Sequence, residues 1–203
     1  MVTFDSIKPT LRTKDCFIFD LDGTLVDLNA PWSDIKNKLS EVAEQELHES
    51  VSFQPLWEGC RYAKKKYGKE SVNIFKKELE REENRAARDF SAVHKVGVSI
   101  LHRIRALFSE DEIKDKQFHV LSNNFRTTVQ FCLKKHEIND FFYAYYGRDD
   151  VPKMKPKPHG LQYICEKHSV SKDKMVFFGD SKWDKQAAEN FGIDFFRVDE
   201  IEN

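Results

Sequence analysis

The sequence has no strong excess of charge of either sign and no long apolar run. Its 203 residues include 33 basic and 34 acidic side chains, for a formal net charge of −1. This balance gives no reason to expect nucleic acid or an anionic membrane as a partner, although a local basic pocket for a small phosphorylated ligand is compatible with it. The longest apolar runs have only the length of a strand, so no segment is expected to span a bilayer.

Cysteine is also scarce, and its spacing excludes two common kinds of site. The four cysteines form no C-x-x-C pair and have no histidine cluster at zinc spacing; they are Cys16, Cys60, Cys132 and Cys165. Neither a structural zinc site nor a dithiol redox motif is therefore expected. Residues 1–14 contain no apolar stretch of signal-peptide length. We expect reduced thiols and a cytoplasmic location.

Apolar runs that end in polar residues predict the strands. Apolar residues make up 40% of the chain and charged residues 33%, which is typical of a globular protein. Short apolar runs predict strands at residues 16–19, 118–121, 174–178 and 193–198, with a weaker aromatic candidate at 141–146. Helical spacing of apolar residues occurs between them at 93–108, 125–136, 158–168 and 183–191. Strands that alternate with helices predict an α/β fold with a parallel sheet.

The segment from residue 28 to residue 90 differs from the rest of the chain. It is rich in Glu and Lys and has no convincing strand pattern. Trp32, Ile35 and Leu39 recur at helical spacing, and residues 71–88 carry a second strong helical pattern. We therefore expect a helical cap domain at residues 28–90, inserted into a core made of residues 1–27 and 91–203.

Two carboxylates stand at the end of the first predicted strand. Side chains two residues apart on an extended segment project the same way, so Asp20 and Asp22 can enter one site. In open parallel sheets, sites form beyond the carboxyl ends of the strands. A solvated turn or a helix cap remains an alternative. A calcium loop does not fit, because Leu25 and Pro31 stand where such a loop requires Gly and Glu.

Residues 20–27 resemble motif I of the haloacid dehalogenase-like (HAD) hydrolases. The other three motifs of that family follow in order, as Leu121-Ser122-Asn123-Asn124, Lys155-Pro156-Lys157-Pro158 and Gly179-Asp180-Ser181-Lys182-Trp183-Asp184. The resemblance extends over most of the expected core and is strongest to the phosphoglycolate phosphatase-like subgroup with a helical cap. It implies a Rossmann-like, three-layer α/β/α core.

The resemblance also implies chemical roles for the acidic residues. Asp20 would attack phosphorus and form an aspartyl-phosphate. Asp22 would protonate the leaving oxygen and then deprotonate the attacking water. Asp20, the backbone carbonyl of Asp22, and Asp180 would bind Mg²⁺, which prefers oxygen ligands.

The remaining motif residues each have an ordinary structural alternative. Ser122, Asn123 and Lys155 would bind the substrate phosphate, and Asp184 would lie in the second shell of the site. Ser122 could instead cap the helix expected at 125–136, and Asn123 could merely shape the turn. Lys155 could belong to a solvated basic loop. Asp184 matches a capping box with Ser181, and it could cap the helix while also hydrogen-bonding a metal-bound water or Lys155.

The resemblance therefore implies a Mg²⁺-dependent phosphomonoesterase that acts on a small phosphorylated metabolite, and we expect a monomer or homodimer. A sugar-phosphate mutase of the same family shares all four motifs and remains an alternative. A non-catalytic binding protein with this fold is a second alternative, which predicts damage in at least one motif. No motif in this sequence is damaged.

Overall fold

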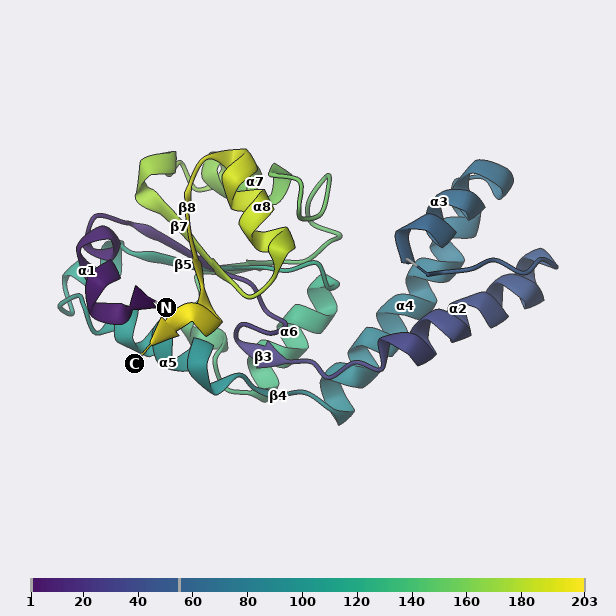
Figure 1. Cartoon of the computed structure of the whole chain (residues 1–203), viewed down its shortest axis with the longest axis horizontal. Helices are drawn as coiled ribbons and strands as arrows, with labels where there is room; N and C mark the ends of the chain where they lie inside the picture. Colours follow the sequence, from purple (N-terminus) through teal and green to yellow (C-terminus); the bar gives the residue numbers. More distant parts are fainter. Residues whose placement is uncertain (1, 55, 203) are drawn as a thin grey trace. The chain divides into compact units, whose positions relative to one another are not determined.

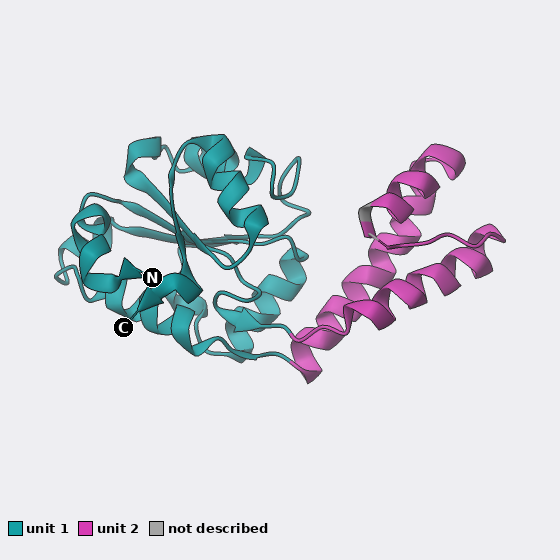
Figure 2. Cartoon of the chain, viewed as in Figure 1, with its two compact units in different colours: residues 1–28, 91–203 teal, residues 29–90 magenta. Residues whose placement is uncertain are grey.

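The computed structural model describes residues 2–54 and 56–202, apart from the side chain of Trp57. The chain folds as two compact units, residues 1–28 with 91–203 and residues 29–90, as Figure 2 shows. The second unit begins one residue later than the expected boundary at residue 28. Within the described ranges, no helix has the length and apolar character needed to cross a membrane.

A five-stranded parallel sheet forms the centre of the first unit. Its strands are β2 (Cys16–Phe19), β5 (Gln117–Leu121), β6 (Ala144–Tyr146), β7 (Met175–Gly179) and β8 (Asp194–Arg197). They pair in the order β6-β5-β2-β7-β8, and every pairing is parallel. All five apolar runs that predicted strands contribute to this sheet, which confirms the α/β fold class.

Aromatic side chains stack across the central strands. The rings of Phe19 and its neighbour Phe178 lie 4.8 Å apart, centroid to centroid, and those of Phe17 and Phe118 lie 5.0 Å apart. All four β2 side chains are buried, because other strands flank β2 on both edges and helices cover both faces. Burial on both faces explains why β2 reads as a continuous apolar run rather than an alternating one.

Helices cover both faces of the sheet. Those of the first unit are α1 (Phe4–Arg12), α5 (Lys95–Arg105), α6 (Arg126–Lys135), α7 (His159–Lys167) and α8 (Lys182–Phe191). Figure 1 shows α7 and α8 on one side of the sheet and α5 and α6 on the other. On the first side, Ile164 of α7 and Ala188 of α8 share a core cluster with Ile18 and Phe177 of the sheet. This arrangement confirms the three-layer core.

Several short elements of the first unit lie outside the predicted pattern. Helix α1 buries three residues at helical spacing, Phe4, Ile7 and Leu11. Two pairs of two-residue strands also form, β1 (Val2–Thr3) with β9 (Ile201–Glu202) and β3 (Val26–Asp27) with β4 (Ala92–Val93). Short 3₁₀ turns lie at Glu112–Asp115, Asn139–Phe141, Lys172–Lys174 and Val198–Glu200. Segments of two to four residues are too short to show a period in the sequence.

The second unit consists of helices α2 (Trp32–Leu47), α3 (Leu56–Tyr67) and α4 (Lys69–Asp89). Helix α4 packs against both of the others. Its buried side chains include Phe75 and Leu79, and the Phe75 ring lies 4.8 Å from that of Phe53. No strand lies in the described part of residues 29–90, as the sequence pattern predicts.

Candidate active site

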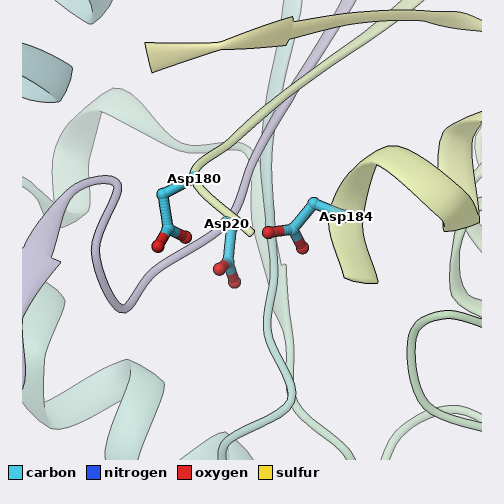
Figure 3. A group of neighbouring side chains, drawn as sticks. All are labelled: Asp20, Asp180 and Asp184. Carbon is cyan, nitrogen blue, oxygen red and sulfur yellow. The ribbon is translucent and has the colours of Figure 1, made fainter. Parts of the chain in front are cut away.

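Three carboxylates meet at the carboxyl ends of two neighbouring strands. Asp20 follows β2, and its amide donates to the carbonyl of Phe178 at 2.8 Å. Asp180 follows β7 directly. One oxygen from each of Asp20, Asp180 and Asp184 lies within 4.8 Å of the other two, and Figure 3 shows the three side chains converging. The convergence follows from the parallel pairing of β2 with β7.

Gly23 lets the chain turn closely past this group. Its φ angle is +79°, a left-handed conformation that L side chains rarely adopt. A Cβ atom at this position would lie 2.5 Å from Oδ2 of Asp180. Both the backbone conformation and the space beside Asp180 therefore require glycine here.

Lys155 lies between two of the carboxylates. Its Nζ is 2.7 Å from Oδ1 of Asp20 and 2.5 Å from Oδ1 of Asp184, and it also donates to the carbonyl of Leu121 at 3.1 Å. The side chain is only 4% exposed, whereas Lys153 and Lys157 are exposed. The solvated-loop alternative for Lys155 is therefore wrong.

Asp184 caps helix α8 while it binds Lys155. The side chain of Ser181 accepts from the amide of Asp184, and Oδ2 of Asp184 accepts from the amide of Ser181. The Ser181 hydroxyl also donates to Oδ2 of Asp184 at 2.5 Å, leaving Oδ1 toward Lys155. The predicted capping box is confirmed, and of the two partners left open for Asp184, a metal-bound water or Lys155, the structure shows an ion pair with Lys155. One fully buried carboxylate thus fixes the start of α8 relative to Lys155.

Asn123 holds the main chain of Lys155. Its Oδ1 accepts from the Lys155 amide at 3.0 Å, and its Nδ2 donates to the Lys155 carbonyl at 3.0 Å. Both polar ends of the side chain are therefore engaged by one residue of the neighbouring loop. The arrangement suits a positioning role more than direct donation to a phosphate. Sequence reasoning missed it, because residues 123 and 155 are far apart in the chain.

We expect Asn123→Ala to lower the free energy of unfolding by about 1–3 kcal/mol, since two hydrogen bonds are lost at about 0.5–1.5 kcal/mol each. Urea unfolding measures the change. Asn190→Ala is a matched control, because the Asn190 side chain donates a single exposed hydrogen bond to the neighbouring Pro156 carbonyl. A loss at Asn123 no larger than that at Asn190 would contradict the positioning role.

Ser122 closes the turn after β5. Its hydroxyl donates to Oδ1 of Asn124 at 3.0 Å and accepts from the Asn124 amide at 3.1 Å. The N-cap of α6 is Phe125, which makes no side-chain cap. The alternative in which Ser122 caps this helix is therefore wrong. The hydroxyl lies at the carboxyl end of β5, next to β2 in the sheet.

Asp22 lies at the edge of the acidic group. Its Oδ1 accepts from the amide of Leu28 at 2.8 Å. Burial raises the pKa of Asp22, the Leu28 amide opposes that shift, and the nearby charge of Asp180 adds to it. The protonated form of Asp22 is therefore more favoured than it would be for an aspartate exposed to solvent.

Burial and mutual repulsion raise the pKa values of the clustered acids in this site. Burial, followed by the charge of Asp184, raises the pKa of Asp20, while Lys155 opposes the shift. Burial and Asp184 also raise the pKa of Asp180. Burial lowers the pKa of Lys155, but Asp184 and Asp20 outweigh it and raise that pKa overall. A further positive charge in the site would therefore stabilise the ionised carboxylates.

The donor set fits a hard divalent cation. Oδ1 of Asp180 is buried and has no hydrogen-bond partner among the described residues. The three carboxylates carry a charge of −3 when ionised, and Lys155 supplies +1, so a divalent ion would balance the group. Carboxylate oxygens are the ligands that Mg²⁺ prefers. Asp20 and Asp180 were predicted as ligands, whereas Asp184 was predicted to lie in the second shell.

Sequence relatives include phosphatases of bacteria. A phosphoglycolate phosphatase of Vibrio vulnificus (strain CMCP6) is 31% identical over 102 residues, which are 47% of this chain and 45% of that protein. The pyrophosphatase PpaX of Listeria monocytogenes (strain CLIP80459) is 26% identical over 183 residues, 85% of this chain and 77% of that protein. The chain thus matches less than half the length of the Vibrio phosphatase.

Solved structures share the fold. A predicted phosphoglycolate phosphatase from Haemophilus somnus superimposes with a TM-score of 0.62 at 19% identity, covering 92% of this chain and 88% of that one. A haloacid dehalogenase-like hydrolase from Streptococcus pneumoniae gives 0.59 at 20% identity, covering 91% and 84%. The family model described as haloacid dehalogenase-like hydrolase matches residues 17–198. The chain therefore belongs to the haloacid dehalogenase-like hydrolase family.

Proposed function

We propose that this protein is a Mg²⁺-dependent phosphomonoesterase that acts on a small phosphorylated metabolite through an aspartyl-phosphate intermediate. The observation that carries the proposal is the contact between Lys155 and Asp20 inside a group of three converging carboxylates. The names of the relatives, a phosphoglycolate phosphatase and a pyrophosphatase, support phosphoryl chemistry.

Asp20 is the proposed nucleophile. A carboxylate oxygen attacks phosphorus, the bond from phosphorus to the leaving oxygen breaks, and an aspartyl-phosphate forms. Water then attacks phosphorus, which releases inorganic phosphate and restores the carboxylate. Lys155, 2.7 Å from Asp20, holds the carboxylate in place and offsets the negative charge of an arriving phosphate.

Asp22 is the proposed acid and base. Its burial-raised pKa favours the protonated form, which can donate a proton to the leaving oxygen. The resulting carboxylate can then accept a proton from the attacking water. The two steps return Asp22 to its starting form at the end of each cycle.

Asp20, Asp180 and the backbone carbonyl of Asp22 are the residues we propose to hold Mg²⁺. The bound ion would reduce the electrostatic repulsion between a carboxylate nucleophile and an anionic phosphate. Ser122 is proposed to hydrogen-bond a phosphate oxygen from the carboxyl end of β5. Asn123 would contribute indirectly, by fixing the loop that carries Lys155.

The helical unit, residues 29–90, is the proposed cap that selects the substrate. We propose a monomer or homodimer in the cytoplasm, without nucleic acid or membrane partners.

A sugar-phosphate mutase would use the same core residues. The products separate the two functions, because a phosphatase releases inorganic phosphate whereas a mutase returns an isomeric phosphate ester.

Hydrolysis of p-nitrophenyl phosphate tests the proposal. We expect turnover with Mg²⁺, loss of turnover with excess EDTA, and recovery when Mg²⁺ exceeds the chelator. Inorganic phosphate should appear in a one-to-one ratio with nitrophenol. Turnover that EDTA leaves unchanged would overturn the metal requirement, and no turnover of any compound in a phosphometabolite panel would overturn the enzyme assignment. Isomerisation without phosphate release in that panel would establish the mutase instead.

A further inference from the structure

The turn that follows β5 contacts Lys155 at two points. Nζ of Lys155 donates to the carbonyl of Leu121 at 3.1 Å, and Asn123 holds the Lys155 main chain. Lys155 in turn lies 2.7 Å from Asp20. Ser122 stands between the two contact points in the chain and is only 2% exposed. Its hydroxyl therefore belongs to the same buried site as the proposed nucleophile.

A single residue occupies two of the three hydrogen-bonding positions of this hydroxyl. Oγ of Ser122 donates to Oδ1 of Asn124 at 3.0 Å and accepts from the Asn124 amide at 3.1 Å. A hydroxyl has one donor position and two acceptor positions, so one acceptor position remains. The oxygens of an ionised phosphate accept hydrogen bonds. In this arrangement Ser122 therefore has no proton to donate to a phosphate.

The backbone of the turn is fixed without the side chain of Asn124. The Ser122 amide donates to the carbonyl of Tyr146 at 2.9 Å, and the Asn124 carbonyl accepts from the amide of Arg148 at 2.8 Å. Tyr146 ends β6, and Arg148 lies in the loop that follows. Main-chain bonds to the neighbouring strand thus hold both ends of the turn. The side chain of Asn124 consequently acts on the Ser122 hydroxyl more than on the path of the backbone.

The other end of the Asn124 carboxamide holds an unused donor. Asn124 is 6% exposed, and within residues 2–54 and 56–202 its Nδ2 makes no hydrogen bond. Rotated by half a turn about its last bond, the carboxamide keeps its shape and presents Nδ2 to Ser122 in place of Oδ1. Oγ of Ser122 then accepts two hydrogen bonds from Asn124, and the hydroxyl proton points elsewhere. The rotation breaks no bond at the Nδ2 end.

We propose that Asn124 is a positioning residue, which directs the hydroxyl proton of Ser122 to the substrate phosphate by rotating its carboxamide when phosphate binds. The inference rests on the proposed function, in which Ser122 binds a phosphate oxygen. Without phosphate, Oδ1 of Asn124 accepts the proton and satisfies the buried hydroxyl. With phosphate, Nδ2 and the main-chain amide fill both acceptor positions of Ser122. A hydrogen bond to a charged acceptor is stronger than one to a neutral amide, and this difference favours the rotated state.

Binding of inorganic phosphate with Mg²⁺ tests the inference by isothermal calorimetry on the full chain. We expect Ser122→Ala to weaken binding about tenfold to a hundredfold, as loss of one hydrogen bond to a charged group predicts. Asn124→Ala should weaken binding at least about threefold when Ser122 is present and less than about twofold when it is alanine, because Asn124 acts through that hydroxyl. Equal weakening in both backgrounds, or no saturable binding by the native protein, would overturn the inference.

Asn124→Asp separates a rotating carboxamide from a fixed one. Aspartate has nearly the same shape and keeps an acceptor for the Ser122 proton, so the turn is preserved, but it has no donor. Its charge repels phosphate whether or not the hydroxyl is present, so Asn124→Asp in the Ser122→Ala background measures repulsion alone. With Ser122 present, we expect a loss of binding at least about threefold larger than this repulsion causes. The same loss in both backgrounds would refute the rotation.

Kinetics with p-nitrophenyl phosphate give a readout that partial unfolding does not produce. The bond from Ser122 is made to the phosphate of the bound substrate, so Asn124→Ala should raise KM at least about threefold and change kcat less than about twofold. A lower kcat with an unchanged KM, which is the effect of losing folded protein, would contradict the positioning role.

Asn139→Ala is the matched control, because the Asn139 side chain bonds only to the adjacent Asp140, at 3.3 Å, among the described residues. We expect this variant to bind phosphate as the native protein does, and weakening equal to that of Asn124→Ala would overturn the inference. The calorimetry needs no turnover. Coupled binding without hydrolysis would therefore refute the proposed function alone, whereas hydrolysis without coupling would refute the role of Asn124 alone.

Discussion

Lys155→Met is expected to destabilise the metal-free protein by about 3–5 kcal/mol, the usual cost of removing one partner from a buried ion pair. The substitution leaves Asp20 and Asp184 buried beside each other with no cation between them. Methionine has a similar length, so the main change is loss of charge and hydrogen bonding rather than loss of volume. Each carboxylate must then lose its proton in a poorly solvated site or remain neutral.

Urea unfolding in EDTA measures this effect. Lys153→Met and Lys157→Met are matched controls from the same loop, because both side chains are exposed. Surface substitutions of this kind usually change stability by less than about 0.5 kcal/mol. A loss below about 1 kcal/mol for Lys155→Met, well under the usual cost of breaking a buried pair, would show that the two carboxylates do not depend on this cation.

The deficit of the Lys155 variant should depend on pH in a defined direction. Burial already raises the pKa of Asp20 above its unfolded value, and removal of Lys155 takes away a charge that opposes this shift. The folded variant therefore holds its protons more tightly than the unfolded chain. A carboxyl whose pKa is raised by folding lowers the free energy of unfolding at pH values above its unfolded pKa, which is about 4 for aspartate. Below that pH it has little effect on stability. The difference between native and variant should shrink as the pH is lowered from about 7 toward about 4.

Asp20→Asn is expected to lower turnover of p-nitrophenyl phosphate by at least about 10³-fold, since an amide cannot replace a carboxylate nucleophile. The fold should persist. Asparagine has nearly the same shape, and a neutral side chain removes the repulsion between Asp20 and Asp184. We therefore expect the variant to unfold at the same or a higher urea concentration than the native protein in EDTA.

Acid-quenched trapping of a phosphoenzyme gives a second readout. Native protein mixed with labelled substrate should carry acid-stable label, and Asp20→Asn should carry none. Asp111→Asn is the control, because its side chain is 94% exposed and contacts only Lys114 among the ion pairs described. Turnover of Asp20→Asn within about tenfold of native would refute the nucleophile assignment whatever the trapping result.

The regular part of the core was predictable from the sequence. Strand β2 is a continuous apolar run because it is buried on both faces, and the same holds for β7, all of whose residues are buried. Elements with a weaker local signal were missed. Two-residue strands such as β3 have no period to detect, and their pairing depends on a distant segment, here β4.

Local patterns left several site residues ambiguous. The sequence around Lys155 reads equally well as a solvated basic loop, and two similar lysines stand close by in the chain. The family motif selects Lys155, and the packed structure gives the physical reason, because it buries Lys155 against Asp20 and Asp184 while Lys153 and Lys157 remain exposed. The two hydrogen bonds of Asn123 with the Lys155 backbone likewise depend on contacts across the sheet edge.

The sequence by itself determined the fold class, the helical insertion and the group of acids that begins at Asp20. It could do so because buried strands and helices carry apolar residues in recognisable runs or at recognisable spacing. In addition, Asp20 and Asp180 directly follow two of those strands. The tertiary structure alone decided that Lys155 contacts both Asp20 and Asp184, and that Asn123 holds the backbone of Lys155. These outcomes depend on distances between segments that are remote in the chain, and no local pattern encodes such distances.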